Sequence, residues 1–135
     1  MKSLAQRGAL LFGVVFLLVG ILGLFVDNGM SMDADMATAG RLFGLFPVNL
    51  LHNLVHLGFG VWGIVASRGK GASVTYGWLG GAVYGALVIL AFVTPTLFGL
   101  VPIGGHDIWL HAVLALGLLG LAVSGRKGTG AATPV

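Results

Sequence analysis

Apolar residues fill four long stretches of the chain, and polar and charged residues gather between them. The stretches cover residues 8–26, 47–67, 74–94 and 107–124. Because the hydrocarbon core of a bilayer is about 30 Å thick, a helix needs roughly 20 apolar residues to cross it. The stretches are apolar on nearly every face, whereas a helix on the surface of a soluble domain shows only an apolar stripe. The pattern predicts an all-α protein, an integral membrane bundle of four helices.

The composition favours the same class of protein. The 135 residues are 57% hydrophobic and 8% charged, with a mean hydropathy of +1.02. A soluble domain carries roughly 25% charged residues, so a water-soluble globule of this composition would lack a charged surface. We expect one transmembrane domain over 1–135, ending in a small polar tail at 128–135 that is disordered. The chain has no cysteine, which excludes disulfides and thiolate metal sites.

The two longer connections contain apolar residues of their own. In the first, Ser31 followed by Asp33 and Asp35 is typical of a helix start, with acids at the positive end of the helix dipole. The segment over 27–46 therefore predicts a short helix lying in the membrane interface. The connection over 96–105 is apolar, and we expect it to pack on the bundle or to lie in the interface.

Basic residues lie mostly on one side of the four-span arrangement. Six fall on the side of the termini: Lys2, Arg7, Arg68, Lys70, Arg126 and Lys127. The other side has Arg41 and all four aspartates. By the positive-inside rule, both termini are cytoplasmic. The first stretch also resembles a secretion signal, but its apolar run is too long, so we expect it to stay attached. Membrane lipid, and not nucleic acid, is the partner that these charges favour.

Small residues mark one face of the third stretch. Gly77, Gly81 and Gly85 follow one another at four-residue spacing, which places them on one side of a helix. Helices in a membrane associate through close packing, and small residues permit it. This face either packs within the four helices or forms the interface of a homo-oligomer or a larger membrane complex.

Polar side chains inside the stretches form a candidate site. They are Asn49, His52, Asn53 and His56 on the second stretch, Tyr84 on the third, and Asp107 and His111 on the fourth. Spacings of three and four residues place neighbours on one helix face. An unpaired polar group in hydrocarbon costs several kcal/mol, so these faces should turn inward. We expect the second and fourth stretches to be neighbours around a polar core that opens toward the outside.

Three roles are consistent with this cluster. In the first, its side chains form interhelical hydrogen bonds worth about 1 kcal/mol or less each, which suits a structural or accessory protein without a cofactor. In the second, His52, His56 and His111 with Asp107 bind zinc or copper, or two facing histidines bind haem. In the third, the same groups carry protons, although the inner half of the bundle offers few polar groups. The structural role leads, and the sequence favours no enzymatic class because GxSxG, HExxH, P-loop and GxGxxG patterns are missing.

Two segments carry a resemblance to a known family. PVNLLHNLVHLGFGVWG at 47–63 and HDIWLHAVLALGLL at 106–119, with Arg68, Tyr76 and Gly85 between them, resemble the small membrane proteins catalogued as domain of unknown function 4383. The resemblance extends over about 8–124. Its N-x-x-H-N-x-x-H and D-x-x-x-H patterns fall on the asparagines, histidines and aspartate of the candidate site. It implies four helices and a bacterial membrane, and it implies no activity. Together with the charge bias, it leads us to expect a protein of the bacterial cytoplasmic membrane.

Overall fold

The computed structural model describes residues 1–126, and four helices make up most of them. They are α1 (Leu4–Leu24), α2 (Leu50–Ala66), α3 (Lys70–Val93) and α4 (Asp107–Arg126). A two-stranded antiparallel hairpin of β1 (Gly40–Leu42) and β2 (Phe46–Val48) precedes α2. The predicted all-α bundle of four helices is confirmed. The predicted disordered tail at 128–135 lies outside the described residues.

Local caps set where the helices begin. Ser3 and Gln6 form a capping box, in which Ser3 Oγ accepts from the Gln6 amide and Gln6 Oε1 accepts from the Ser3 amide, so α1 starts before the predicted residue 8. Asn49 caps α2 by accepting from the His52 amide at 2.9 Å. The predicted start of this helix at Pro47 is therefore wrong, because Pro47 lies in β2.

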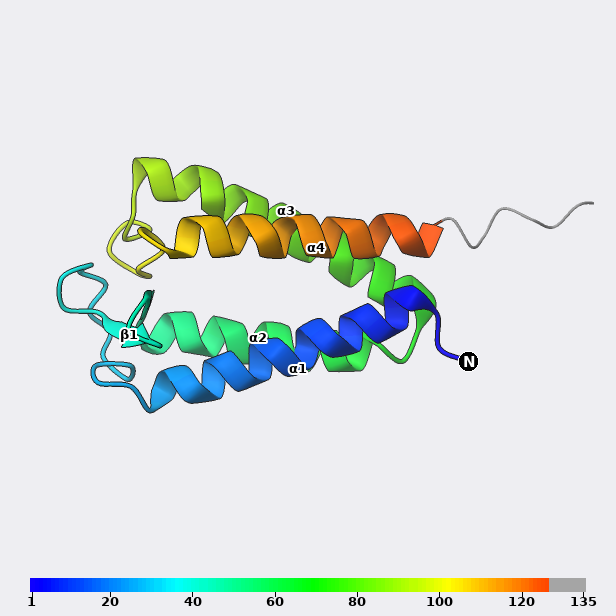
Figure 1. Cartoon of the computed structure of the whole chain (residues 1–135), viewed down its shortest axis with the longest axis horizontal. Coiled ribbons are helices and arrows are strands. Elements are labelled where there is room, and N and C mark those ends of the chain that lie inside the picture. The colour runs from blue at the N-terminus through cyan, green and yellow to red at the C-terminus, as the bar shows by residue number, and fades with distance from the viewer. Residues whose placement is uncertain (127–135) are drawn as a thin grey trace, which may run out of the picture.

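The helices associate as two pairs. α1 packs along α2, and α3 packs along α4. Figure 1 shows the pairs close together at the end where a short turn joins α2 to α3, and further apart at the hairpin end. α2 and α4 do not pack along each other, so the expectation that they are neighbouring helices is wrong for their backbones. Their side chains meet instead in the space between the two pairs, as described below.

Glycines allow the close approach within each pair. A Cβ atom on Gly13 would lie 2.6 Å from the Ile64 amide nitrogen of α2. On α3, a Cβ atom on Gly77 would lie 2.7 Å from the Leu118 carbonyl oxygen, and one on Gly81 would lie 2.6 Å from the Leu119 side chain. Nothing lies within 4 Å of the same position on Gly85. Gly77 and Gly81 of the predicted glycine face therefore pack against another helix of the same chain, whereas Gly85 does not.

Aromatic side chains fill the bundle below the candidate site. The rings of Phe16 and Tyr84 stack with centroids 5.3 Å apart, and Phe59 lies 5.3 Å from Tyr84 in an edge-on arrangement. The Tyr76 hydroxyl donates to the Phe59 carbonyl at 3.3 Å. With Leu118 from α4, these residues form a dry core that joins all four helices.

The connection after α1 has no interfacial helix, so that prediction is wrong. Ser31 Oγ accepts from the Asp33 amide, Asp33 Oδ1 from the Asp35 amide, and Asp35 Oδ1 from the Ala37 amide. Such local bonds offer the backbone an alternative to helical hydrogen bonds, and they favour turns. The segment therefore makes a series of turns before the hairpin.

The connection between α3 and α4 packs on the bundle, as expected. Val101 and Ile103 are buried and lie against Ala91 of α3. Asn49 ties this connection to the start of α2, because its Nδ2 donates to the Leu100 carbonyl at 2.8 Å. The connection and the hairpin together cover the end of the bundle at which the polar side chains lie.

Three helices are long and apolar enough to cross a membrane: α1, α3 and α4. α2 is apolar but has 17 residues, since the first residues of the predicted span belong to β2 and to the cap. Large apolar side chains point away from the bundle, and Phe92 and Leu116 are 74% and 72% exposed. In water such a surface would be a liability, whereas in lipid it is the surface that a membrane protein presents.

Candidate metal centre

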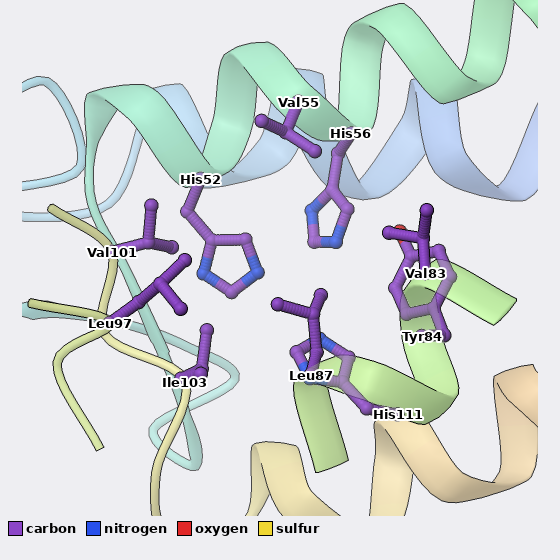
Figure 2. Close-up of a pocket in the computed structure, with 10 residues that line it drawn as sticks. All are labelled: His52, Val55, His56, Val83, Tyr84, Leu87, Leu97, Val101, Ile103 and His111. Atoms are coloured by element: carbon purple, nitrogen blue, oxygen red, sulfur yellow. The ribbon is translucent and has the colours of Figure 1, made fainter. Parts of the chain in front are cut away.

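Three buried histidines converge between the helix pairs. His52 and His56 lie one turn apart on α2, and His111 reaches them from α4. The ring centroid of His52 lies 4.5 Å from that of His56 and 5.9 Å from that of His111. One ligand nitrogen from each residue lies within 4.8 Å of the other two. Figure 2 shows the three imidazoles around one cavity.

Several polar atoms of this region have no hydrogen-bond partner among the described residues. They are the Nδ1 atoms of His52, His56 and His111, the Tyr84 hydroxyl and Asp107 Oδ2. The carbonyl groups of Pro47 and Pro102 approach the His52 ring without making a hydrogen bond to its Nδ1. A buried polar group without a partner costs about 1–3 kcal/mol. The burial of these atoms without partners is thus energetically costly.

Asp107 lies beside His52. It is the first residue of α4, and it is buried, with Oδ2 3.7 Å from His52 Nε2. Asp107 lies four residues before His111 on one helix face, but its carboxylate projects across to α2. The two atoms lie beyond hydrogen-bonding distance, so the carboxylate and the imidazole are close neighbours without a hydrogen bond between them.

The two asparagines of α2 do not enter the cluster. Asn49 is used in the cap and in its bond to the Leu100 carbonyl. Asn53 turns toward α1, where its Nδ2 donates to the Gly29 carbonyl at 2.9 Å. Adjacent side chains on a helix differ in direction by about 100°, so Asn53 cannot point into the same space as His52. The expectation that all four polar side chains of this helix share one core is wrong.

Tyr84 of α3 completes the inner side of the cluster. Its ring centroid lies 5.2 Å from that of His111, and its hydroxyl is buried without a partner. It lines the cavity with the three histidines, as Figure 2 shows. The sequence included Tyr84 in the candidate site, and the structure brings it to one cavity with His56.

The cavity has a volume of about 150 Å³ and is otherwise apolar. Its remaining wall consists of Val55, Val83, Leu87, Leu97, Val101 and Ile103. Because Val101 and Ile103 cover the outer end and the histidines are buried, the expected opening toward the outside is wrong. The contribution of the connection to this wall was not predicted from the sequence, although the apolar run at 97–103 is the signal for it.

Comparisons with curated proteins and with solved structures found no match. One family model, described as "Domain of unknown function (DUF4383)", matches residues 6–124. The match spans most of the chain and includes the whole histidine cluster with Tyr84 and Asp107. The chain therefore belongs to this family of unknown function.

Proposed function

We propose that the chain is a membrane protein that binds one transition-metal ion, zinc or copper, through His52, His56 and His111. The observation that carries this proposal is the approach of one nitrogen from each buried imidazole to within 4.8 Å of the other two. Imidazole is the commonest protein ligand for metals, and it suits both zinc and copper. Three nitrogen ligands with a fourth open position are typical of reactive zinc sites.

The size of the cluster fits such an ion after a small contraction. Zinc–nitrogen bonds are about 2.0–2.1 Å long, which places the nitrogens of a tetrahedral site about 3.4 Å apart. The ligand nitrogens of the three histidines lie at most 4.8 Å apart, and this upper limit exceeds the separation in a tetrahedral site. Small rotations of imidazoles that already surround a cavity would close the difference.

The unpartnered nitrogens favour ion binding over a purely structural role. A structural cluster would use its imidazoles to form hydrogen bonds between helices. The Nδ1 atoms of His52, His56 and His111 make no such bond. An ion that binds one nitrogen of each imidazole would offset part of the cost of burying these side chains.

Haem and proton transport receive less support. A cavity of about 150 Å³ is the size that holds a benzene molecule in an engineered core, and a porphyrin is several times larger. A proton path would need polar groups toward the other end of the bundle. The core there consists of side chains such as Phe16, Phe59 and Leu118.

We further propose a multi-pass arrangement in a bacterial cytoplasmic membrane with both termini inside. The N-terminus and the last turn of α4 lie at the same end of the bundle (Figure 1). Arg68, in the turn between α2 and α3, and Lys70, the first residue of α3, lie at that end too. Basic residues near span ends favour the cytoplasmic side.

Metal titration tests the site directly. Protein purified without chelators would be titrated with Zn²⁺ against a chromophoric chelator, together with His52→Ala, His56→Ala and His111→Ala. Each variant should bind zinc more than about 100-fold more weakly. Loss of a residue that only orients a ligand typically costs about 10–100-fold in metal affinity, so a larger loss indicates a direct ligand. His106→Ala is the matched control, because His106 is exposed and accepts a hydrogen bond from Trp109 outside the cluster.

Two results would overturn the proposal. One is wild-type protein that neither retains nor takes up zinc or copper. The other is an equal loss of affinity in His106→Ala and in the three cluster variants. Far-ultraviolet circular dichroism on each variant would check that the helices remain.

A further inference from the structure

The open side of the histidine cluster faces an apolar space at the flank of the bundle. Val55 of α2 and Val83 of α3 line the cavity and are 40% and 43% exposed. Val101 and Ile103, which cover the cavity at the outer end, are 8% and 1% exposed. Both valines lie within helices whose outward surface is apolar. An apolar molecule in the hydrocarbon layer can therefore reach the cluster from this flank.

The charges of the site favour an anionic ligand. The proposed divalent ion brings two positive charges, and its three imidazole ligands are neutral when bound. Asp107 is the acidic side chain beside the cluster, where it lies 3.7 Å from His52. One positive charge is left over in a low-dielectric environment, which is costly. A single negatively charged oxygen donor at the open position would neutralise it.

Tyr84 offers a contact for a second oxygen of the same ligand. Its hydroxyl is buried and lacks a hydrogen-bond partner, and its side chain lines the cavity together with the three imidazoles. A hydroxyl can donate to one oxygen of a carboxylate whose other oxygen binds the ion. The cavity is lined almost entirely by apolar surface, which matches an alkyl chain, and the carboxylate would be held by the ion and the Tyr84 hydroxyl (Figure 2).

We propose that the open coordination position binds the carboxylate of a single-chain, long-chain carboxylic acid drawn from the membrane. One oxygen binds the ion, the other accepts from the Tyr84 hydroxyl, and the chain leaves between Val55 and Val83. This assignment rests on the proposed metal site. A volume of about 150 Å³ holds the first carbons of the chain, and the rest lies in lipid.

The test uses Co²⁺ as a visible probe of the site. Co²⁺-loaded protein in lipid nanodiscs would be titrated with octanoate, acetate and 1-octanol while the ligand-field spectrum is followed. Octanoate should change the spectrum at a concentration at least 100-fold lower than acetate, since each buried methylene strengthens binding roughly fourfold. 1-Octanol, with the same chain and no charge, should leave the spectrum unchanged.

Variants distinguish binding of octanoate in the cavity from simple partitioning of octanoate into the lipid. Val83→Trp should close the opening and weaken octanoate binding at least tenfold, whereas Val113→Trp, an equally apolar change at an exposed position of α4 outside the cavity, should not. Tyr84→Phe removes only the hydroxyl, and should weaken octanoate binding about tenfold. The uptake of Co²⁺ would be measured for each variant.

The outcomes distinguish this inference from the proposal on which it rests. A Co²⁺ spectrum that responds equally to octanoate and acetate, or equally in both tryptophan variants, overturns the carboxylate assignment and leaves the metal site standing. Tighter binding of octyl phosphate than of octanoate would also overturn it. Failure of the protein to bind Co²⁺ and Zn²⁺ overturns both.

Discussion

Oδ2 of Asp107 lies 3.7 Å from Nε2 of His52, and this approach links the first turn of α4 to the first turn of α2 across the space between the helix pairs. Both side chains are buried. A histidine that binds a metal commonly donates its second ring N–H to a carboxylate, which fixes its tautomer and orientation. In the proposed metal site we expect Asp107 to act as a positioning residue for His52, after a small movement that brings the two atoms from 3.7 Å to hydrogen-bonding distance.

The substitution Asp107→Asn should weaken zinc binding without abolishing it. The amide keeps the size of the side chain but loses its negative charge, and loss of such a partner typically costs 10–100-fold in metal affinity. A chelator-competition titration of zinc measures the change. Asp35→Asn, at an exposed position of the loop after α1, is the control. Unchanged affinity in Asp107→Asn would show that the carboxylate does not act on His52.

The sequence allowed part of this site to be predicted, and helix periodicity explains which part. The spacing of His52 and His56 fixes their common direction on α2, and insertion into hydrocarbon requires that direction to be inward. Periodicity does not fix the distance between two helices that do not pack together. It therefore could not show that the Asp107 carboxylate meets His52, or that a connecting segment covers the cavity.

Asn53 should contribute to stability and not to metal binding. Asn53→Ala leaves the buried Gly29 carbonyl without its donor, and such a loss costs about 1–3 kcal/mol. We expect a lower melting temperature in detergent and an unchanged affinity for zinc. Asn28→Gly removes an equivalent bond to the Thr38 carbonyl at an exposed position, tolerates the positive φ of 61° at this residue, and should have a smaller effect. Weaker zinc binding in Asn53→Ala, at unchanged stability, would place Asn53 in the site after all.

Glycines on one face of α3 should differ in their tolerance of a methyl group. Gly77→Ala places a Cβ 2.7 Å from the Leu118 carbonyl oxygen and 2.9 Å from the Ala122 amide nitrogen, where backbone atoms cannot easily move aside. Overpacking of this kind costs about 1–3 kcal/mol. Gly85→Ala adds the same methyl group where nothing lies within 4 Å, so its stability should be unchanged or slightly higher. Thermal unfolding of both variants in detergent provides the comparison.

The opposite ranking of these two variants would have a definite meaning. If Gly85→Ala destabilised the protein more than Gly77→Ala, the open face of α3 would have to contact another chain. That result would favour the homo-oligomer or membrane complex among the two sequence interpretations of this glycine face.

The helices were more predictable than the connection after α1, because the two depend on different interactions. Long apolar runs leave a chain in lipid few options besides helix, since every backbone group must be paired internally. In the loop, short polar side chains compete for the backbone amides. Asp33 accepts from the Thr38 hydroxyl and the Asp35 amide, and these donors lower the pKa of its carboxyl group. Such bonds replaced the expected interfacial helix with turns.

The orientation in the membrane can be tested on a chain that has no cysteine of its own. Ala37→Cys and Ala72→Cys introduce single thiols at exposed positions toward opposite ends of the bundle. With the termini inside, a membrane-impermeant maleimide should label Ala37→Cys in intact bacterial cells and Ala72→Cys only after permeabilisation. Labelling in the reverse order would place Arg68 and Lys70 outside and contradict the assignment based on charge. Equal labelling of both variants in intact cells would contradict a membrane-spanning arrangement, because an impermeant reagent cannot reach both faces of a closed bilayer.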